Sequence, residues 1–308
     1  MYEKSEYGKI YRIKAAIAIL VMLTLIFNSR ALSEAIISGA RLALLSVVPP
    51  LFPMFIISDF LCALPSTSKG GRADAIFERL FGINGEGIRA FVCGNICGFP
   101  IGASCSAEML NSGTIDTDEC ERLIGICSCP SAAFVISGVG LAICGSIKDG
   151  IILYICSVLS AILCGIIHKR KRMFSSKTNV ISRQSFIFSS SIKSAASRCV
   201  NVCAHISLFS AILSVTDLIF KNPMTRAFIS IPIEMSNAAK RLSQIPLPSH
   251  HIRLALIGTA IGFSGICVLM QIKSVLPRTI SMRKYTIMKI EQGMICGLLS
   301  LLCSIIFR

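Results

Sequence analysis

The chain has 308 residues, of which 53% are hydrophobic and only 15% are charged, and its mean hydropathy is +0.72. This composition excludes an ordinary soluble domain and predicts an all-α, polytopic helical membrane protein. The net charge of +15 does not indicate a nucleic-acid partner, because Lys and Arg cluster in short segments beside apolar spans and no tryptophan is present. Most of the fifteen cysteines lie singly in apolar windows without a paired C-x-x-C set, so we expect no metal and no other cofactor.

The N-terminal part contains two predicted spans. The first, residues 13–27, follows a basic N-terminus and lacks a small-x-small cleavage site behind it, so we expect an uncleaved anchor with a cytoplasmic N-terminus. The second covers residues 35–63 and should be interrupted at Pro49-Pro50 and again at Pro53. An amphipathic helix over residues 72–81 is expected next, lying at the membrane surface.

The stretch "CGNICGFPIGASCSAEMLNSG", residues 93–113, is apolar but carries Pro100 among regularly spaced glycines. A broken backbone at membrane depth is tolerated only inside protein or beside a wet cavity, because each unpaired backbone group costs several kcal/mol in hydrocarbon. If the stretch enters and returns, the basic residues 169–171 fall on the cytoplasmic side, which favours a re-entrant hairpin. Two interpretations of Gly94, Gly98 and Gly102 remain open: a small-residue packing stripe, or a tip that faces a ligand.

The remaining elements repeat this order. We expect an interrupted span over residues 123–147 with its break at Cys129-Pro130, and a straighter span over 151–167. The second half should contain a span over 199–220, a hairpin over 223–248, a span over 254–276 broken at residues 262–265, a cytoplasmic basic loop over 277–289 and a last span over 292–307.

These elements predict about seven spans plus two re-entrant hairpins, arranged in two inverted structural repeats. Each half reads as a span, a hairpin, an interrupted span and a straighter span, and the halves enter the membrane from opposite sides, as in secondary transporters. The expected division is an anchor over residues 1–34, a first repeat over 35–172 and a second, inverted repeat over 173–308.

The hairpin tips and the span interruptions should meet near the bilayer midplane and form a solute site. Glu234 is the strongest single candidate, because an ionisable side chain in an apolar stretch is costly; the alternatives are a structural ion pair and an exposed loop. Glu234, Asp59 and Glu108 are candidates for coupling to H⁺ or Na⁺, although Asp59 and Glu108 also fit span ends at the interface. The predicted solute-binding residues are Asn95, Gly98, Pro100, Gly102, Ser128, Pro130, Ser131, Glu234, Ser236, Asn237 and Ser264.

Four segments in this order resemble one known family. They are "VVPPLFPMFIISDFL" (47–61), "GNICGFPIGA" (94–103), "CSCPSAAFVISGVG" (127–140) and "PIEMSNAA" (232–239), and they are similar to the YlbJ-type sporulation integral membrane proteins with a nucleoside-recognition (Gate) domain. The resemblance covers residues 35 to the C-terminus. It implies kinship with concentrative nucleoside transporters, a role in endospore formation, a multi-pass position in the cell or forespore membrane, and movement of dipicolinic acid, a small aromatic dicarboxylate.

The resulting hypothesis is a secondary transporter or permease for a small polar or anionic heteroaromatic solute. Its expected partners are that solute, the lipid bilayer and a further copy of the chain. The alternative is a non-transporting membrane scaffold or ligand sensor. We do not expect an enzyme, because the sequence has no nucleophile-base-acid set, phosphate loop or metal-ligand cluster.

Overall fold

The computed structural model describes residues 27–63, 71–170 and 187–307, and all regular secondary structure in these ranges is helical. The first expected span, residues 13–27, lies outside the described residues except for Phe27. Many large apolar side chains point outward along the long helices, among them Leu45, Leu159 and Leu298, as a surface in contact with lipid requires. Within the described ranges, five helical stretches are long and apolar enough to cross a membrane: Ser29–Phe60, Ile147–Ile167, Phe188–Ile219, His250–Val275 and Met282–Ile306.

The first of these stretches comprises α2 (Ser29–Leu42), η1 (Ala43–Val47) and all but the last three residues of α3 (Val48–Ala63). The expected interruption at Pro49-Pro50 and Pro53 is wrong, because the backbone remains helical through all three prolines. Instead, the five residues of η1 form a wider π-helical turn just before them. A proline clashes with the carbonyl four residues earlier, and for Pro49 and Pro50 those carbonyls belong to η1. The widened turn accommodates the prolines without ending the helix.

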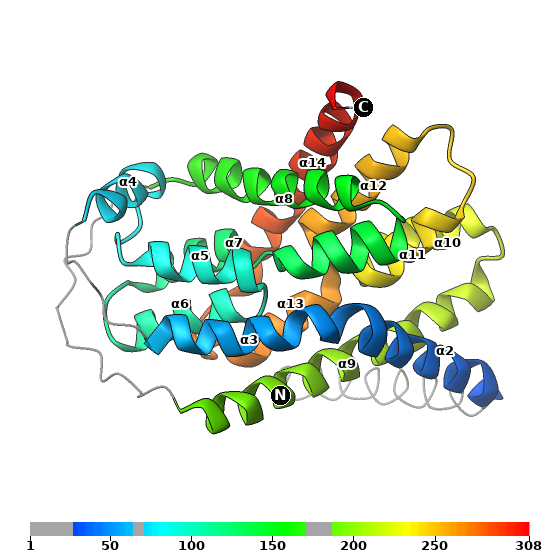
Figure 1. Cartoon of the computed structure of the whole chain (residues 1–308), viewed down its shortest axis with the longest axis horizontal. Helices are drawn as coiled ribbons and strands as arrows, with labels where there is room; N and C mark the ends of the chain where they lie inside the picture. Colours follow the sequence, from blue (N-terminus) through cyan, green and yellow to red (C-terminus); the bar gives the residue numbers. More distant parts are fainter. Residues whose placement is uncertain (1–26, 64–70, 171–186, 308) are drawn as a thin grey trace, which may run out of the picture.

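Two pairs of short helices each have an abrupt break in the middle (Figure 1). The expected amphipathic helix is confirmed as α4 (Arg72–Phe81) and leads into the first pair, α5 (Gly87–Cys97) and α6 (Ile101–Asn111), which pack against each other. The second pair is α10 (Pro223–Ile233) and α11 (Met235–Gln244), which also pack together. The breaks lie at Gly98–Pro100 and at Glu234.

The two interrupted spans break where the sequence indicates. In the first, α7 (Thr117–Cys127) is separated from η2 (Phe134–Ile143), and residues 128–131 form the break. Because each piece is short, this predicted span is not among the five long stretches. In the second, α12 (His250–Phe263) passes into α13 (Gly265–Val275) through Ser264 and Gly265, whose φ angles of +68° and +84° lie in the left-handed region.

Three longer helices complete the fold: α8 (Ile147–Ile167), α9 (Phe188–Ile219) and α14 (Met282–Ile306). The start of the last one differs from expectation. The sequence predicts a cytoplasmic loop up to Lys289, but α14 already begins at Met282, and Lys289 is buried inside the protein. Ser281 caps the new start by accepting a hydrogen bond from the Arg283 amide at 3.3 Å.

The basic segments expected on one side of the membrane meet at one end of the molecule, the end marked by α4 in Figure 1. Asp118 at the start of α7 accepts hydrogen bonds from Arg122 (2.9 Å), Arg170 (3.2 Å) and Lys284 (2.6 Å). Burial alone would raise the pKa of Asp118, but the hydrogen bonds from Lys284 and Arg122 outweigh it and hold the pKa below its ordinary value. The ends of α8 and α14 are thereby tied to α7.

Candidate functional site

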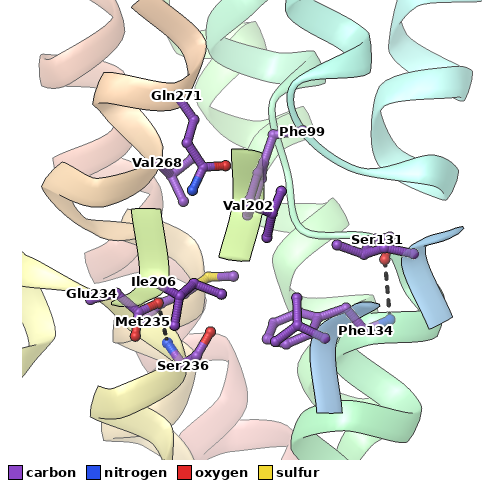
Figure 2. A pocket seen from close by; sticks show the side chains of 12 residues that line it. Phe99, Ser131, Phe134, Val202, Ile206, Glu234, Met235, Ser236, Val268 and Gln271 are labelled. Atoms are coloured by element: carbon purple, nitrogen blue, oxygen red, sulfur yellow. Dashed lines mark hydrogen bonds between the residues drawn. The ribbon is translucent and has the colours of Figure 1, made fainter. Parts of the chain in front are cut away.

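The interrupted spans and both helix pairs meet at a small cavity in the middle of the molecule (Figure 2). Its volume is about 20 Å³. Four polar side chains line it: Ser131 from the break of the first interrupted span, Glu234 and Ser236 from the second helix pair, and Gln271 from α13. The apolar part of the wall consists of Val47, Leu51, Phe99, Phe134, Val202, Ile206, Met235 and Val268.

Glu234 caps the N-terminus of α11. Its carboxylate accepts hydrogen bonds from the amides of Ser236 (2.9 Å) and Asn237 (2.7 Å) and from Asn237 Nδ2 (2.8 Å). The residue is 2% exposed, and among the described residues no Lys, Arg or His nitrogen forms a salt bridge with it. The carboxyl group is therefore held by backbone N–H groups at the start of α11 and not by an ion pair or by exposure on a loop.

Asn237 connects the second helix pair to α9. Its Nδ2 donates to the Glu234 carboxylate and also to Ser210 Oγ, at 2.9 Å. Ser210 in turn donates to the Ile206 carbonyl at 2.8 Å, and Ile206 lines the cavity. The position of the carboxylate is thus fixed from two elements, which is what a binding group requires.

The tip of the first helix pair packs against the break of the first interrupted span. Gly98 has φ +88°, and a Cβ added there would lie 2.7 Å from the Ser131 amide nitrogen, so only glycine fits. The Phe99 amide donates to the Cys129 carbonyl at 3.1 Å, and the Phe99 ring points into the cavity (Figure 2). Ser131 also lines the cavity, and its hydroxyl accepts a hydrogen bond from the Phe134 amide at 3.1 Å.

The other two glycines of the stripe are packing positions in this structure. A Cβ on Gly94 or on Gly102 would overlap the Cys127 carbonyl oxygen. Their small size lets α5 and α6 approach the end of α7 closely. The two sequence interpretations therefore apply to different residues: Gly94 and Gly102 lie in the packing stripe, and Gly98 lies at the tip beside the cavity-lining Ser131.

The second helix pair packs against the second interrupted span in a similar way. A Cβ on Gly265 would lie 2.9 Å from the Ile233 carbonyl oxygen, so the backbone at the tip and the backbone at the break are in contact. One and two turns further along α13, Val268 and Gln271 reach the cavity. Gln271 Nε2 donates to Cys267 Sγ at 3.5 Å, whereas its buried Oε1 accepts no hydrogen bond from the described residues.

The predicted site residues separate into two groups. Ser131, Glu234 and Ser236 line the cavity. The coupling candidate Asp59 does not line it and pairs with Arg198 at 2.6 Å, and Glu108 is exposed. The other predicted residues lie in or beside the breaks without lining the cavity: Asn95, Gly98, Pro100, Gly102, Ser128, Pro130, Asn237 and Ser264.

Sequence reasoning missed Gln271 and Lys289. Lys289 is 1% exposed, and its Nζ donates to the Ser128 carbonyl (3.2 Å) and to Gln292 Oε1 (2.9 Å). Gln292 Nε2 donates to the Gly125 carbonyl at 2.8 Å, so both side chains hold the C-terminal carbonyls of α7. The signal was present in the helical spacing of the buried residues Tyr285, Met288, Lys289, Gln292 and Cys296.

The cavity can bind a polar molecule by hydrogen bonds. It presents one carboxyl group, two hydroxyl groups and one amide in an apolar wall. Comparison with protein-family models, with curated proteins and with solved structures finds no match.

Proposed function

We propose that the protein is a secondary transporter for a small polar heteroaromatic solute that binds between two re-entrant hairpins, α5–α6 and α10–α11. The observation that carries this proposal is the cavity at which both hairpin tips meet, with the Glu234 carboxylate and the unpaired Gln271 Oε1 in its wall. A buried acceptor without a donor is unfavourable, and a solute N–H or O–H group would satisfy it.

The packing of the tips supports an inverted-repeat arrangement. In the first half the tip at Gly98 contacts the break at Ser131, and in the second half the tip at Ile233 contacts the break at Gly265. Each half also contributes one long helix to the cavity wall, through Leu51 on α3 and Ile206 on α9. Two halves that repeat the same contacts around one central cavity are the arrangement expected of an alternating-access transporter.

The charge of the wall restricts the solute. Of the described residues that line the cavity, Glu234 alone has an acidic or basic side chain. Two like charges about 4 Å apart repel each other by about 4 kcal/mol at an effective dielectric constant of about 20. A neutral nucleoside-like solute avoids this repulsion, whereas a dicarboxylate such as dipicolinate requires a protonated Glu234. Transport of an anion would therefore be coupled to proton uptake at this residue.

The size of the cavity requires a conformational change. A volume of about 20 Å³ accommodates one water molecule, since a water needs roughly 10–15 Å³ on the same measure. A heteroaromatic ring can enter only if the tips and breaks separate. The left-handed backbone at Ser264 and Gly265 lies directly behind the second tip and is where we expect this movement to occur.

The resemblance to YlbJ-type proteins agrees with this proposal and adds its setting. It implies transport at the cell or forespore membrane of a sporulating cell, with a dipicolinate- or nucleoside-like solute, and we include this setting in the proposal. The segments that carry the resemblance include the first tip and the first break, and the segment with Glu234, and all of these lie at the cavity.

Flux through purified protein in lipid vesicles tests the proposal. We expect wild-type protein to move dipicolinate or a nucleoside, and E234Q and P100A to lose the flux, because they change the charged group and the broken backbone of the two tips. E34Q, at an exposed carboxylate paired with Arg30, is the matched control and should transport normally. Normal flux in both E234Q and P100A would rule out the site, and no flux of any tested solute in wild type would rule out the function.

The small volume of the cavity also fits a second candidate, a ligand sensor that does not transport. A sensor would bind a solute, with a shift in its unfolding temperature, but show no flux in vesicles. A scaffold would show neither response.

A further inference from the structure

A separate cluster of ligand atoms lies where α8 ends against α14. Cys164 lies in the last turn of α8, and His168, the residue that ends this helix, follows four residues later on the same side, because its amide donates to the Cys164 carbonyl at 3.0 Å. Glu291 approaches both from α14. His168 Nε2 is 2.7 Å from Glu291 Oε2, and Cys164 Sγ is 3.4 Å from the same oxygen. All three ligand atoms lie within 4.8 Å of one another.

We propose that Cys164, His168 and Glu291 bind a divalent zinc ion. A thiolate, an imidazole and a carboxylate are the three protein ligands that Zn²⁺ prefers, and three ligands leave one position open. With ordinary zinc bond lengths, tetrahedral geometry separates a sulfur and an oxygen ligand by about 3.6 Å and a nitrogen and an oxygen ligand by about 3.4 Å. The Cys164–Glu291 pair already has nearly this spacing, and the His168–Glu291 pair has to separate by about 0.7 Å.

The charges around the cluster leave it able to accept the ion. Among the described residues, the salt-bridge partner of Glu291 is His168 alone. The nearest lysine along α14, Lys289, directs its ammonium to the Ser128 carbonyl and to Gln292, not to the Glu291 carboxylate. When Cys164 releases its thiol proton to solvent, the thiolate and the carboxylate together neutralise Zn²⁺, which offsets the cost of placing the ion at a partly buried site.

The cluster is accessible from one side. The side chains of His168 and Glu291 are 30% and 31% exposed, whereas Cys164 is buried. Water can therefore enter the fourth position while the thiolate stays protected. A bound ion would fix the C-terminal end of α8 to α14, beside the ionic contacts that join α14 to Asp118. This inference concerns a site apart from the central cavity and does not depend on transport.

Zinc titration of the full-length, metal-stripped protein in detergent tests the site. We expect the unfolding temperature to rise with added Zn²⁺, and Co²⁺ to produce a thiolate-to-metal charge-transfer band in the near ultraviolet. Loss of one ligand should weaken Zn²⁺ binding by at least about tenfold. H168Q and E291Q change half-exposed side chains and should fold normally, and C164S should abolish the charge-transfer band.

The matched control is C156S, which changes a buried cysteine two helical turns earlier on α8, away from His168 and Glu291. It should keep both the affinity and the band. Equal Zn²⁺ affinity in wild type, H168Q and E291Q would overturn the proposal, as would a charge-transfer band that survives in C164S or disappears in C156S. Any of these results would mean that His168 and Glu291 interact only with each other, across the end of α8 and α14, and do not hold a metal ion.

Discussion

The residues around the cavity are held by their own backbone contacts more than by one another. Glu234 is fixed by the first turn of α11, Ser131 by the Phe134 amide and Gly98 by its left-handed backbone. Binding sites on broken helices need such local support, because the freed backbone groups would otherwise be unpaired. Substitutions at the breaks should therefore change stability and solute binding together.

Gly98 offers a clean test of the contact between tip and break. G98A should lower the unfolding temperature in detergent by several degrees more than G113A. Both glycines have positive φ, +88° and +71°, so both variants carry a backbone cost, and that of G98A includes the ψ of 178° at Gly98, which few residues other than glycine adopt. Only at Gly98 does the new Cβ meet Ser131, whereas at Gly113 it meets nothing within 4 Å. Equal destabilisation would show that the tip does not press against the break.

At this scale the sequence predicts part of the site. Ser131, Glu234 and Ser236 were found because helix breakers and a carboxylate stand out in apolar stretches. Gln271 was missed because a single amide inside a span carries no charge and no breaker. The Cys164–His168 pair does not follow a C-x-x-C pattern, and its spacing of four, which puts two side chains on one side of a helix, is also common among residues that bind no metal.

Helices α7 and α14 form a unit through polar groups inside the membrane region. Lys289 and Gln292 of α14 satisfy the carbonyls of Ser128 and Gly125 at the end of α7, and this end is the near side of the break that carries Ser131. The break therefore keeps its shape through a helix far away in the sequence. Hydropathy averaged along the sequence does not show which side chain pairs with which carbonyl, so these contacts could not be predicted from it.

The prediction for this unit concerns Gln292. Q292A leaves the buried Gly125 carbonyl without its side-chain donor and removes one acceptor from Lys289, so we expect a loss of about 1–3 kcal/mol in the free energy of unfolding. Q244A, which changes an exposed glutamine at the end of α11, should leave this free energy nearly unchanged. Denaturant unfolding in detergent measures both. A Q292A variant as stable as Q244A would contradict the proposed support of the break.

Element boundaries show why some of the fold was predictable and some was not. The breaks at residues 128–131 and at Ser264 follow from local chemistry, namely a proline and closely spaced glycines. The prolines of α3 also predict a break, but the helix continues through them, because a π-helical turn accommodates them. Likewise, the basic residues around Lys289 indicated a loop, but burial against α7 extended α14 by more than two turns.

For the whole molecule, hydropathy was sufficient to predict the class but not the arrangement. The long apolar helices establish a multi-span membrane protein, since their outward faces are apolar and their inward faces carry the polar contacts. The order of elements also predicted two helix pairs with breaks between long spans. The meeting of both pairs at one cavity, with Gln271 opposite Phe99, depends on contacts between the halves that one sequence does not contain.

The central claim is that a solute binds where the two tips meet, and ligand-dependent thermal unfolding measures this most directly. Wild-type protein, E234Q and E34Q are heated with dipicolinate or with single nucleosides at several pH values. We expect dipicolinate to raise the unfolding temperature of wild type and E34Q only at the lower pH values, where Glu234 binds a proton, and to act on E234Q at every pH, because its side chain is neutral. No shift of wild type with any ligand, or the same pH dependence for dipicolinate in E234Q as in wild type, would contradict the claim.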